Sequence, residues 1–270
     1  MTVSSDPLPA AIRIAREAAR MIRTTVRPRW VRLKASVADI QTSTDVRVER
    51  LIRDRLGTAF PTHTIVGEEG DGFGALDLDR PTWFVDPVDG TTNYHRGLPL
   101  VACNIGFWDG KRLACAVIAD VMNRRVYWAK AGRGAWRGRT RLSVSDTRSL
   151  ARSLVSTGFP ADRSTNDNNN VREFNEMVLR VRDVRRIGAA GIDLSYLAAG
   201  CLDAYWERGD GPWDWAAGAL LVREAGGRVT SWDGTDWMPG MDSMVASNGH
   251  VHDAILRHLA RVAAGRAVTT

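Results

Sequence analysis

The chain has 270 residues, which suits one large domain or two closely packed halves. Hydrophobic residues make up 44% of it and charged residues 25%, so intrinsically disordered and fibrous classes are excluded. The formal net charge is +6, and because only three of the 37 basic residues are lysine, 34 are arginine. This charge is compatible with anionic partners and carries no information about the fold.

The cysteine pattern argues against a secreted or zinc-binding protein. Cys103, Cys115 and Cys201 are far apart and form no Cys-x-x-Cys pair, which excludes a disulfide framework and predicts a reducing compartment. We expect Cys201 to be a small buried hydrophobe. No apolar run approaches the length of a membrane span, and charged residues interrupt the N-terminal segment where a signal peptide would be apolar. The sequence therefore predicts a soluble, cytoplasmic protein with no membrane contact.

The first half begins with helical patterns. Residues 1–8 are expected to form a flexible tail, followed by an amphipathic helix whose apolar residues recur at helical spacing up to Val26. A second helix is expected with Thr44 as its N-cap, ended by Gly57 and Pro61. Strands are then predicted at Thr64–Val66, Trp83–Val85, Val101–Trp108, Arg112–Val121 and Arg125–Lys130.

The second half alternates strands with helices. The predicted strands are Ser153–Thr157, Leu202–Trp206, Arg228–Trp232 and Met244–Ser247. The predicted helices are Val171–Val181, Ala189–Ala199, Trp213–Ala225 and Val251–Ala263. No linker separates the halves, so we expect a single domain over residues 9–265, with halves of about 9–145 and 146–265 that share one cleft.

The strongest chemical signal is the run at 86–91, Asp-Pro-Val-Asp-Gly-Thr, directly after an apolar strand. Pro87 keeps Asp86 extended, and the turn that follows can bring Asp86 and Asp89 to the same side. The glycine permits a tight turn, and Thr91 can begin a helix whose free N–H groups face outward. Such a site can hold cations and a phosphate together, although an Asx-turn that caps a helix would use the same residues.

Three further acidic segments strengthen the cation hypothesis. The pair Glu68 and Glu69 follows an apolar strand, and Asp214 and Asp45 each lie at the start of a predicted helix. Each has an ordinary explanation, as a solvated turn or as a carboxylate favoured by a helix dipole. Together they offer oxygen ligands without a His or Cys cluster, which favours a hard cation such as Mg²⁺.

These residues resemble the inositol monophosphatase family, within the lithium-sensitive, metal-dependent phosphatase superfamily. The matching motifs extend over roughly residues 10 to 262 and are Gly67–Glu69, Trp83–Asn93, Trp213–Gly218, Glu224–Gly227, Lys34, Thr44–Asp45, Gly188–Ala190 and Asp203–Glu207. The resemblance implies an α/β fold, a five-layer αβαβα sandwich of the inositol monophosphatase/fructose-1,6-bisphosphatase type, and a homodimer. It also implies hydrolysis of a phosphate monoester by a metal-activated water, with two or three Mg²⁺ ions bound between the halves.

The resemblance also implies a set of metal ligands. Glu68, Asp86 and the Val88 carbonyl would hold a first ion, and Asp86, Asp89 and Asp214 a second. A third, looser ion would bind at Glu68. Paired cations of this kind can neutralise a phosphate and lower the pKa of a water molecule.

Catalytic roles follow from the same resemblance. The Gly90 and Thr91 amides would hold the phosphate, while Glu68 and Thr91 position the water and Asp45 orients the Thr91 hydroxyl. Lys34 would add positive charge near the mobile metal loop. The implied substrate-binding residues are Asp89, Gly90, Thr91, Gly188, Ala189, Ala190, Glu207 and Asp214.

The identity of the leaving group is harder to predict from the sequence. Glu207 matches a family position that contacts leaving-group hydroxyls, which favours a polyol over a role as a surface glutamate. The loop at 188–191 reads Gly-Ala-Ala-Gly where the family more often has Gly-Thr-Ala-Ala, so an identical mode of inositol recognition is in question. We expect inositol 1-phosphate as substrate, with histidinol phosphate, fructose 1,6-bisphosphate or a nucleotide phosphate as alternatives.

Two rival interpretations remain from the sequence. Haloacid-dehalogenase phosphatases use Asp-x-Asp, whereas this chain has Asp-x-x-Asp with a proline after the first aspartate, so a covalent phospho-aspartate is not expected. The arginines of Arg180–Arg186 could contact RNA or a transcription complex, but the absence of interleaved aromatics favours an arginine-coated helix face and no nucleic acid. His95 is expected to line the site rather than bind a metal.

Overall fold

Seven α-helices and fourteen strands make up the described part of the computed structural model, which covers residues 6–25, 27–34, 36–70 and 76–265. The helices are α1 (Leu8–Thr24), α2 (Ser43–Ala59), α3 (Thr91–Arg96), α4 (Val171–Val178), α5 (Ala190–Ala198), α6 (Pro212–Glu224) and α7 (His252–Ala263). A short 3₁₀ turn, η1, spans Leu150–Arg152.

The first sheet has seven strands in the order β3-β4-β5-β6-β7-β8-β9. Only β3 and β4 run parallel, and every later neighbour is antiparallel. Its strands are β3 (Thr64–Gly67), β4 (Pro81–Asp89), β5 (Ala102–Asp109), β6 (Leu113–Asp120), β7 (Arg125–Lys130), β8 (Ala135–Arg137) and β9 (Thr140–Arg141).

The second sheet has five strands in the order β11-β10-β12-β14-β13. Strand β10 pairs in parallel with both of its neighbours, and the remaining pairs are antiparallel. Its strands are β10 (Leu154–Thr157), β11 (Asp183–Arg185), β12 (Ala204–Arg208), β13 (Arg228–Thr230) and β14 (Ser243–Ser247). A separate antiparallel hairpin joins β1 (Val31–Leu33) to β2 (Ile40–Thr42).

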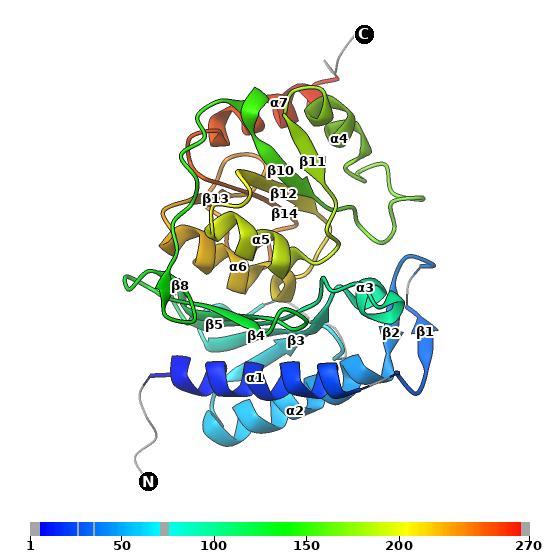
Figure 1. Cartoon of the computed structure of the whole chain (residues 1–270), viewed down its shortest axis with the longest axis vertical. Coiled ribbons are helices and arrows are strands. Elements are labelled where there is room, and N and C mark those ends of the chain that lie inside the picture. Colours follow the sequence, from blue (N-terminus) through cyan, green and yellow to red (C-terminus); the bar gives the residue numbers. More distant parts are fainter. Residues whose placement is uncertain (1–5, 26, 35, 71–75, 266–270) are drawn as a thin grey trace.

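Helices and sheets alternate in five layers, as Figure 1 shows from α1 and α2 at one end to α4 and α7 at the other. The seven-stranded sheet lies between α1/α2 and α5/α6, and the five-stranded sheet lies between α5/α6 and α4/α7. Helices on both faces explain why β5 and β6 are almost wholly buried rather than alternating. Helix α6 is apolar around most of its circumference because it is packed between the two sheets. The expected αβαβα sandwich is confirmed.

The starts of α1 and α2 both differ from the expectation. Helix α1 begins at Leu8, which is buried, so the tail ends earlier than residue 8; residues 1–5 and Val26 lie outside the described residues. Helix α2 is capped by Thr42 and not by Thr44. The Thr42 hydroxyl accepts a hydrogen bond from the Thr44 N–H, and the Asp45 carboxylate accepts one from the Thr42 N–H.

Two other predictions were wrong. Arg180–Arg186 is not a helix face: α4 ends at Val178, and the chain continues into the edge strand β11, which pairs with β10. Cys201 is exposed in the turn after α5, whereas Cys103 and Cys115 are buried. Within the described residues, no helix combines the length and apolar character needed to cross a membrane.

Candidate active site

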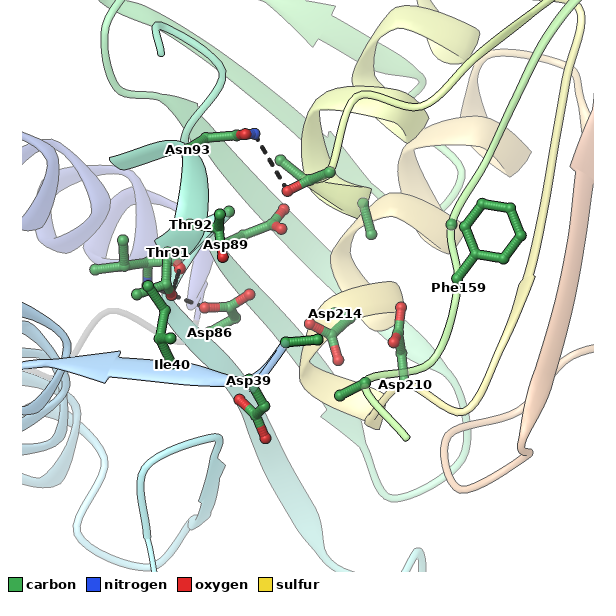
Figure 2. A pocket seen from close by; sticks show the side chains of 18 of the residues that line it. Asp39, Ile40, Asp86, Asp89, Thr91, Thr92, Asn93, Phe159, Asp210 and Asp214 are labelled. Atoms are coloured by element: carbon green, nitrogen blue, oxygen red, sulfur yellow. Dashed lines mark hydrogen bonds between the residues drawn. The ribbon is translucent and has the colours of Figure 1, made fainter. Parts of the chain in front are cut away.

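A pocket of about 780 Å³ opens between the two sheets, where the ends of four elements converge. Its wall is formed by the end of β4 with the start of α3, the starts of α5 and α6, the loop after β10, and the loop between β1 and β2. Figure 2 shows Asp86 and Asp89 from β4 facing the same space as Asp210 and Asp214, which lie at the start of α6. The first sheet and the α5/α6 layer each supply part of this site.

A register shift brings Asp86 and Asp89 to one pocket. In a regular strand, side chains three residues apart point to opposite faces. The pairing of β4 with β5 is irregular between Asp86 and Asp89, so both carboxylates reach the pocket. Asp86 Oδ1 accepts a hydrogen bond from the Val88 N–H at 2.9 Å, and Asp89 Oδ2 accepts one from the Gly191 N–H at 2.6 Å.

The turn after Asp89 requires glycine. Gly90 has φ +86°, in the left-handed region, and a Cβ there would lie 2.8 Å from the Leu100 carbonyl oxygen and 3.0 Å from the Gly188 carbonyl oxygen. Helix α3 begins immediately afterwards at Thr91, so the first backbone N–H groups of α3 have no partner within the helix. Donors of this kind suit a phosphate oxygen.

Thr91 and Asp45 form a hydrogen-bonded pair between α3 and α2. The Thr91 hydroxyl lies 2.8 Å from Asp45 Oδ1 and 2.9 Å from the Val88 carbonyl oxygen. The other carboxylate oxygen of Asp45 accepts hydrogen bonds from the N–H and hydroxyl of Thr42. Burial raises the pKa of Asp45 to about 6, although these hydrogen bonds oppose the shift.

Lys34 holds the glutamate pair that follows β3. Its Nζ lies 2.8 Å from Glu68 Oε1 and 2.9 Å from Glu69 Oε1. Both glutamates raise the pKa of Lys34 above its usual range, against the effect of burial. Burial raises the pKa of Glu68 to about 7. Glu68 lies in the pocket wall, and Lys34 is its cationic partner.

The electrostatics of the pocket fit a hard cation. Burial raises the pKa of Asp86 well above its ordinary value, and the charges of Glu68, Asp89 and Asp214 raise it further. Burial has the same effect on Asp89 and Asp214. Among the described residues no three His, Cys, Asp or Glu side chains form a preassembled metal-ligand set. Even so, carboxylate oxygens are the ligands that Mg²⁺ prefers. These carboxylates also repel one another, so a bound cation would stabilise them in their charged form.

A second part of the wall comes from the loop before α5 and from β12. Gly188, Ala189 and Ala190 line the pocket, and Asn93 Nδ2 fixes that loop by donating to the Ile187 carbonyl at 2.9 Å. Glu207 also lines the pocket and is buried, so it is not a surface glutamate.

The Glu207 carboxylate accepts a hydrogen bond from the Tyr205 hydroxyl. Burial raises the pKa of Glu207 to about 6. The exposed His95 lines the pocket too, as expected.

Sequence reasoning missed six charged residues of the pocket wall: Asp39, Arg96, Arg163, Arg186, Asp193 and Asp210. Asp193 lies in the first turn of α5, and its Oδ1 is buried without a hydrogen-bond partner. Asp210 lies two residues before α6. Asp193 and Asp210 are close in sequence to Ala190 and Glu207, but this closeness does not indicate which way their side chains point. Arg186 belongs to the arginine run that predicts a solvated helix face.

Comparisons with known proteins show what this chain is similar to. A model of the inositol monophosphatase family matches residues 5–264. The chain is 40% identical over 252 residues to the "Nus factor SuhB" of Pseudomonas aeruginosa, which covers 91% of this chain and 93% of that protein. It is 44% identical over 206 residues to the "Inositol-1-monophosphatase SuhB" of Mycobacterium tuberculosis, covering 74% and 71%. Among solved structures, the inositol monophosphatase from Anabaena superposes with a TM-score of 0.84 at 35% identity, covering 94% of this chain and 95% of that one.

Proposed function

Because the chain belongs to the inositol monophosphatase family, we propose that it hydrolyses the phosphate monoester of a small polyol in a Mg²⁺-dependent reaction. The preferred substrate is inositol 1-phosphate, and the products are myo-inositol and phosphate. The observation that carries this proposal is the assembly of Asp86, Asp89, Asp214 and Glu68 around one pocket, beside the free N–H groups of α3.

The carboxylates would hold two or three Mg²⁺ ions. Glu68, Asp86 and the Val88 carbonyl are the ligands proposed for one ion, Asp86, Asp89 and Asp214 for a second, and Glu68 for a third. When bound, the ions supply positive charge beside the phosphoryl oxygens and lower the pKa of a water molecule. The raised pKa values of these carboxylates support this assignment, since a cation relieves their mutual repulsion.

Thr91 and Asp45 would orient the attacking water. When Thr91 donates its single hydroxyl proton in a hydrogen bond to Asp45 Oδ1, the lone pairs of Thr91 Oγ1 can accept a hydrogen bond from the water. Glu68 lines the same pocket and would accept the other hydrogen bond of that water, and it would take up the single proton that the water loses on attack. The Gly90 and Thr91 N–H groups would hold the phosphate by donating to its oxygens.

The leaving group would lie against Glu207 and the loop at 188–190. The hydrogen bond from Tyr205 fixes the Glu207 carboxylate, which can then accept hydrogen bonds from substrate hydroxyls. Alanine at 189 offers no side-chain hydroxyl, so recognition there depends on backbone groups and on shape. Asp89 and Asp214 would face the phosphate end of the substrate as ligands of the proposed Mg²⁺ ions, because carboxylates without a bound cation repel a phosphate.

Phosphate release from a panel of esters tests the proposal. The panel holds inositol 1-phosphate, fructose 1,6-bisphosphate, histidinol phosphate, 3′-phosphoadenosine 5′-phosphate and glycerol 2-phosphate, each with Mg²⁺ and with or without Li⁺. The Asp89→Asn variant, purified identically, controls for contaminating phosphatases. We expect the fastest release from inositol 1-phosphate, with inhibition by Li⁺. Faster release from another ester would overturn inositol 1-phosphate as the preferred substrate. No release from any ester would overturn the proposed phosphatase activity.

A homodimer and a cytoplasmic location are further parts of the proposal. Strand β11 is an open edge of the five-stranded sheet, and Leu98 and Leu179 are large exposed apolar side chains, 50% and 65% exposed. Surfaces of this kind favour self-association. Light scattering during size-exclusion chromatography measures the mass directly, and a monomer at micromolar concentration would contradict the dimer.

A role in a transcription complex is a second candidate, and the name of the Pseudomonas aeruginosa relative supports it. The arginine run identified from the sequence gives it little further support. Arg180 pairs with Glu176, Arg185 pairs with Asp183, and Arg186 lines the pocket. Filter binding of RNA at two salt concentrations separates the candidates, because phosphate contacts weaken steeply with salt. Tight, salt-dependent binding would favour the transcription role.

A further inference from the structure

The loop that follows β10 forms part of the pocket wall and contacts Glu207. Gly158, Phe159 and Ala161 line the pocket, and Figure 2 shows Phe159 on this loop. A Cβ at Gly158 would overlap the Glu207 carboxylate, so the backbone of the loop lies directly against that side chain. The position of the Glu207 carboxylate therefore depends on where Gly158 is held.

Asn170 reaches Gly158 from the opposite face of the five-stranded sheet. Trp206 and Glu207 are neighbours in β12, so their side chains point to opposite faces. Trp206 packs with Met177 of α4 in the outer core, whereas Glu207 lines the pocket. Asn170 lies on the Trp206 side, because the Trp206 indole N–H donates to Asn170 Oδ1 at 2.9 Å.

The partners of the Asn170 amide fix its orientation. Its Nδ2 donates to the Gly158 carbonyl oxygen at 2.6 Å and to the Thr157 hydroxyl at 2.8 Å. An indole N–H can only donate and a carbonyl can only accept, so a reversed amide would leave both without a partner. The side chain is fully buried, and it ties the first residue of the loop to β12.

The backbone of Asn170 also favours a role in the loop. Its φ of +68° lies in the left-handed region, which asparagine adopts more readily than most residues. Asn170 is the N-cap residue of α4, yet its side chain makes no capping hydrogen bond. An N-cap asparagine usually stabilises its own helix. Here the amide is used to hold Gly158 instead.

We propose that Asn170 is a positioning residue for recognition of the leaving group, acting through Gly158 on Glu207. The inference rests on the proposed function, in which Glu207 accepts hydrogen bonds from substrate hydroxyls. The Tyr205 hydroxyl holds the Glu207 carboxylate on one side, and the Gly158 backbone limits it on the other. Without Asn170 the loop can move away, so the contacts to the leaving group weaken. The phosphate end is bound by β4 and α3 and stays in place.

Asn170→Gly tests the side chain alone, because glycine adopts a positive φ without strain. The matched control is Asn168→Gly, the same change at an exposed residue of the same loop. Steady-state hydrolysis with Mg²⁺ is measured for inositol 1-phosphate, or the polyol ester that the wild type prefers, and for 4-nitrophenyl phosphate. The leaving group of 4-nitrophenyl phosphate has no aliphatic hydroxyl to donate to Glu207.

We expect Asn170→Gly to raise KM for the polyol ester by about tenfold with kcat within about twofold, because binding of the leaving group is lost. Both constants for 4-nitrophenyl phosphate should change by less than about twofold, and the control should match the wild type. Circular dichroism melts check folding. Gly158→Ala keeps the Asn170 side chain and displaces Glu207 directly, so it should raise the same KM even where Asn170→Gly does not fold.

Three results would overturn the positioning role. These are equal losses on the two esters in Asn170→Gly, an unchanged KM for the polyol ester in that variant, and an unchanged KM in Gly158→Ala. In each case hydrolysis by the wild type would leave the proposed function standing. A wild type that hydrolyses neither ester would overturn the proposed function and this inference with it.

Discussion

The acidic pocket and the arginine-rich surface of α1 carry charges of opposite sign, and they differ in how these charges are solvated. In the acidic pocket, Asp86 and Asp89 are buried, and their pKa values are raised because water has been removed from around them. On α1, the arginines Arg13, Arg16 and Arg20 are exposed to solvent. Buried like charges destabilise the fold until a counter-ion binds, whereas solvated ones are tolerated. The acidic pocket is therefore the one whose ligand should matter for stability as well as for activity.

The largest expected effect comes from neutralising a buried carboxylate. Asp89→Asn and Asp214→Asn should each lower kcat with Mg²⁺ by on the order of 10³-fold, because charge stabilisation at the phosphoryl group is lost. In EDTA both variants should be at least as stable as the wild type, because each removes one repelling charge. Phosphate release and thermal melts measure the two effects, and near-wild-type turnover would contradict the metal assignment.

A smaller loss should follow from removing the hydroxyl that Asp45 orients. Thr91→Ala should lower kcat by about 10²-fold with little change in KM, because the water loses its acceptor while the backbone N–H remains. Thr91→Ser keeps the hydroxyl and is the matched control, which should retain most of the activity. Equal losses in both variants would point to packing at α3 instead of positioning of water.

Without metal, stability should fall as pH rises. The pKa of Asp45 is raised from 3.8 to about 6 and that of Glu68 from 4.5 to about 7, so the folded state binds more protons than the unfolded state in this range. Their protonated forms stabilise the fold at low pH, and that contribution is lost as pH rises through about 6 to 7.

Urea unfolding in EDTA at about pH 5 and pH 7 measures this loss. Mg²⁺ should reverse the trend by favouring the ionised carboxylates, since a ligand that binds only the folded state stabilises it. The same pH dependence with and without Mg²⁺ would contradict a cation at these residues.

The smallest expected effect comes from removing exposed arginine charges on α1. Arg16→Gln with Arg20→Gln should leave kcat and thermal stability in buffer nearly unchanged, within about twofold for kcat, because exposed surface charges contribute little. Steady-state phosphate release from inositol 1-phosphate checks this. A large loss of activity would mean that the surface of α1 and the acidic pocket are coupled.

Most of the acidic pocket could be predicted from the sequence, but its outer wall could not. Asp86 and Asp89 lie within one short motif, so local turn chemistry already indicated that they act together. Asp193 and Asp210 belong to the same pocket, yet they lie about a hundred residues or more away in the chain. Only the packing of α5 and α6 against the seven-stranded sheet brings them there.

Two predicted element ends were wrong because the sequence offers alternative capping residues and does not show which strands pair. Thr42 and Thr44 are equally good N-cap residues, and the carboxylate of Asp45 decides between them by completing a capping box with Thr42. The run Arg180–Arg186 resembles a charged helix face, but hydrogen bonds to β10 make its centre an edge strand. Such pairing depends on a strand about thirty residues earlier, which no local pattern reveals.

The sequence by itself determined the order of helices and strands and the residues of the acidic motif, because apolar periodicity and turn residues act over short distances. The family and its layered sandwich followed from the resemblance of several motifs taken together. The tertiary structure alone decided which distant charges share a cavity. Asp89 and Asp214 are separated by more than a hundred residues, and the packing of α6 on the seven-stranded sheet makes them neighbours in one pocket. Charges interact through space, and their distances are set by the packing of elements rather than by their order in the chain.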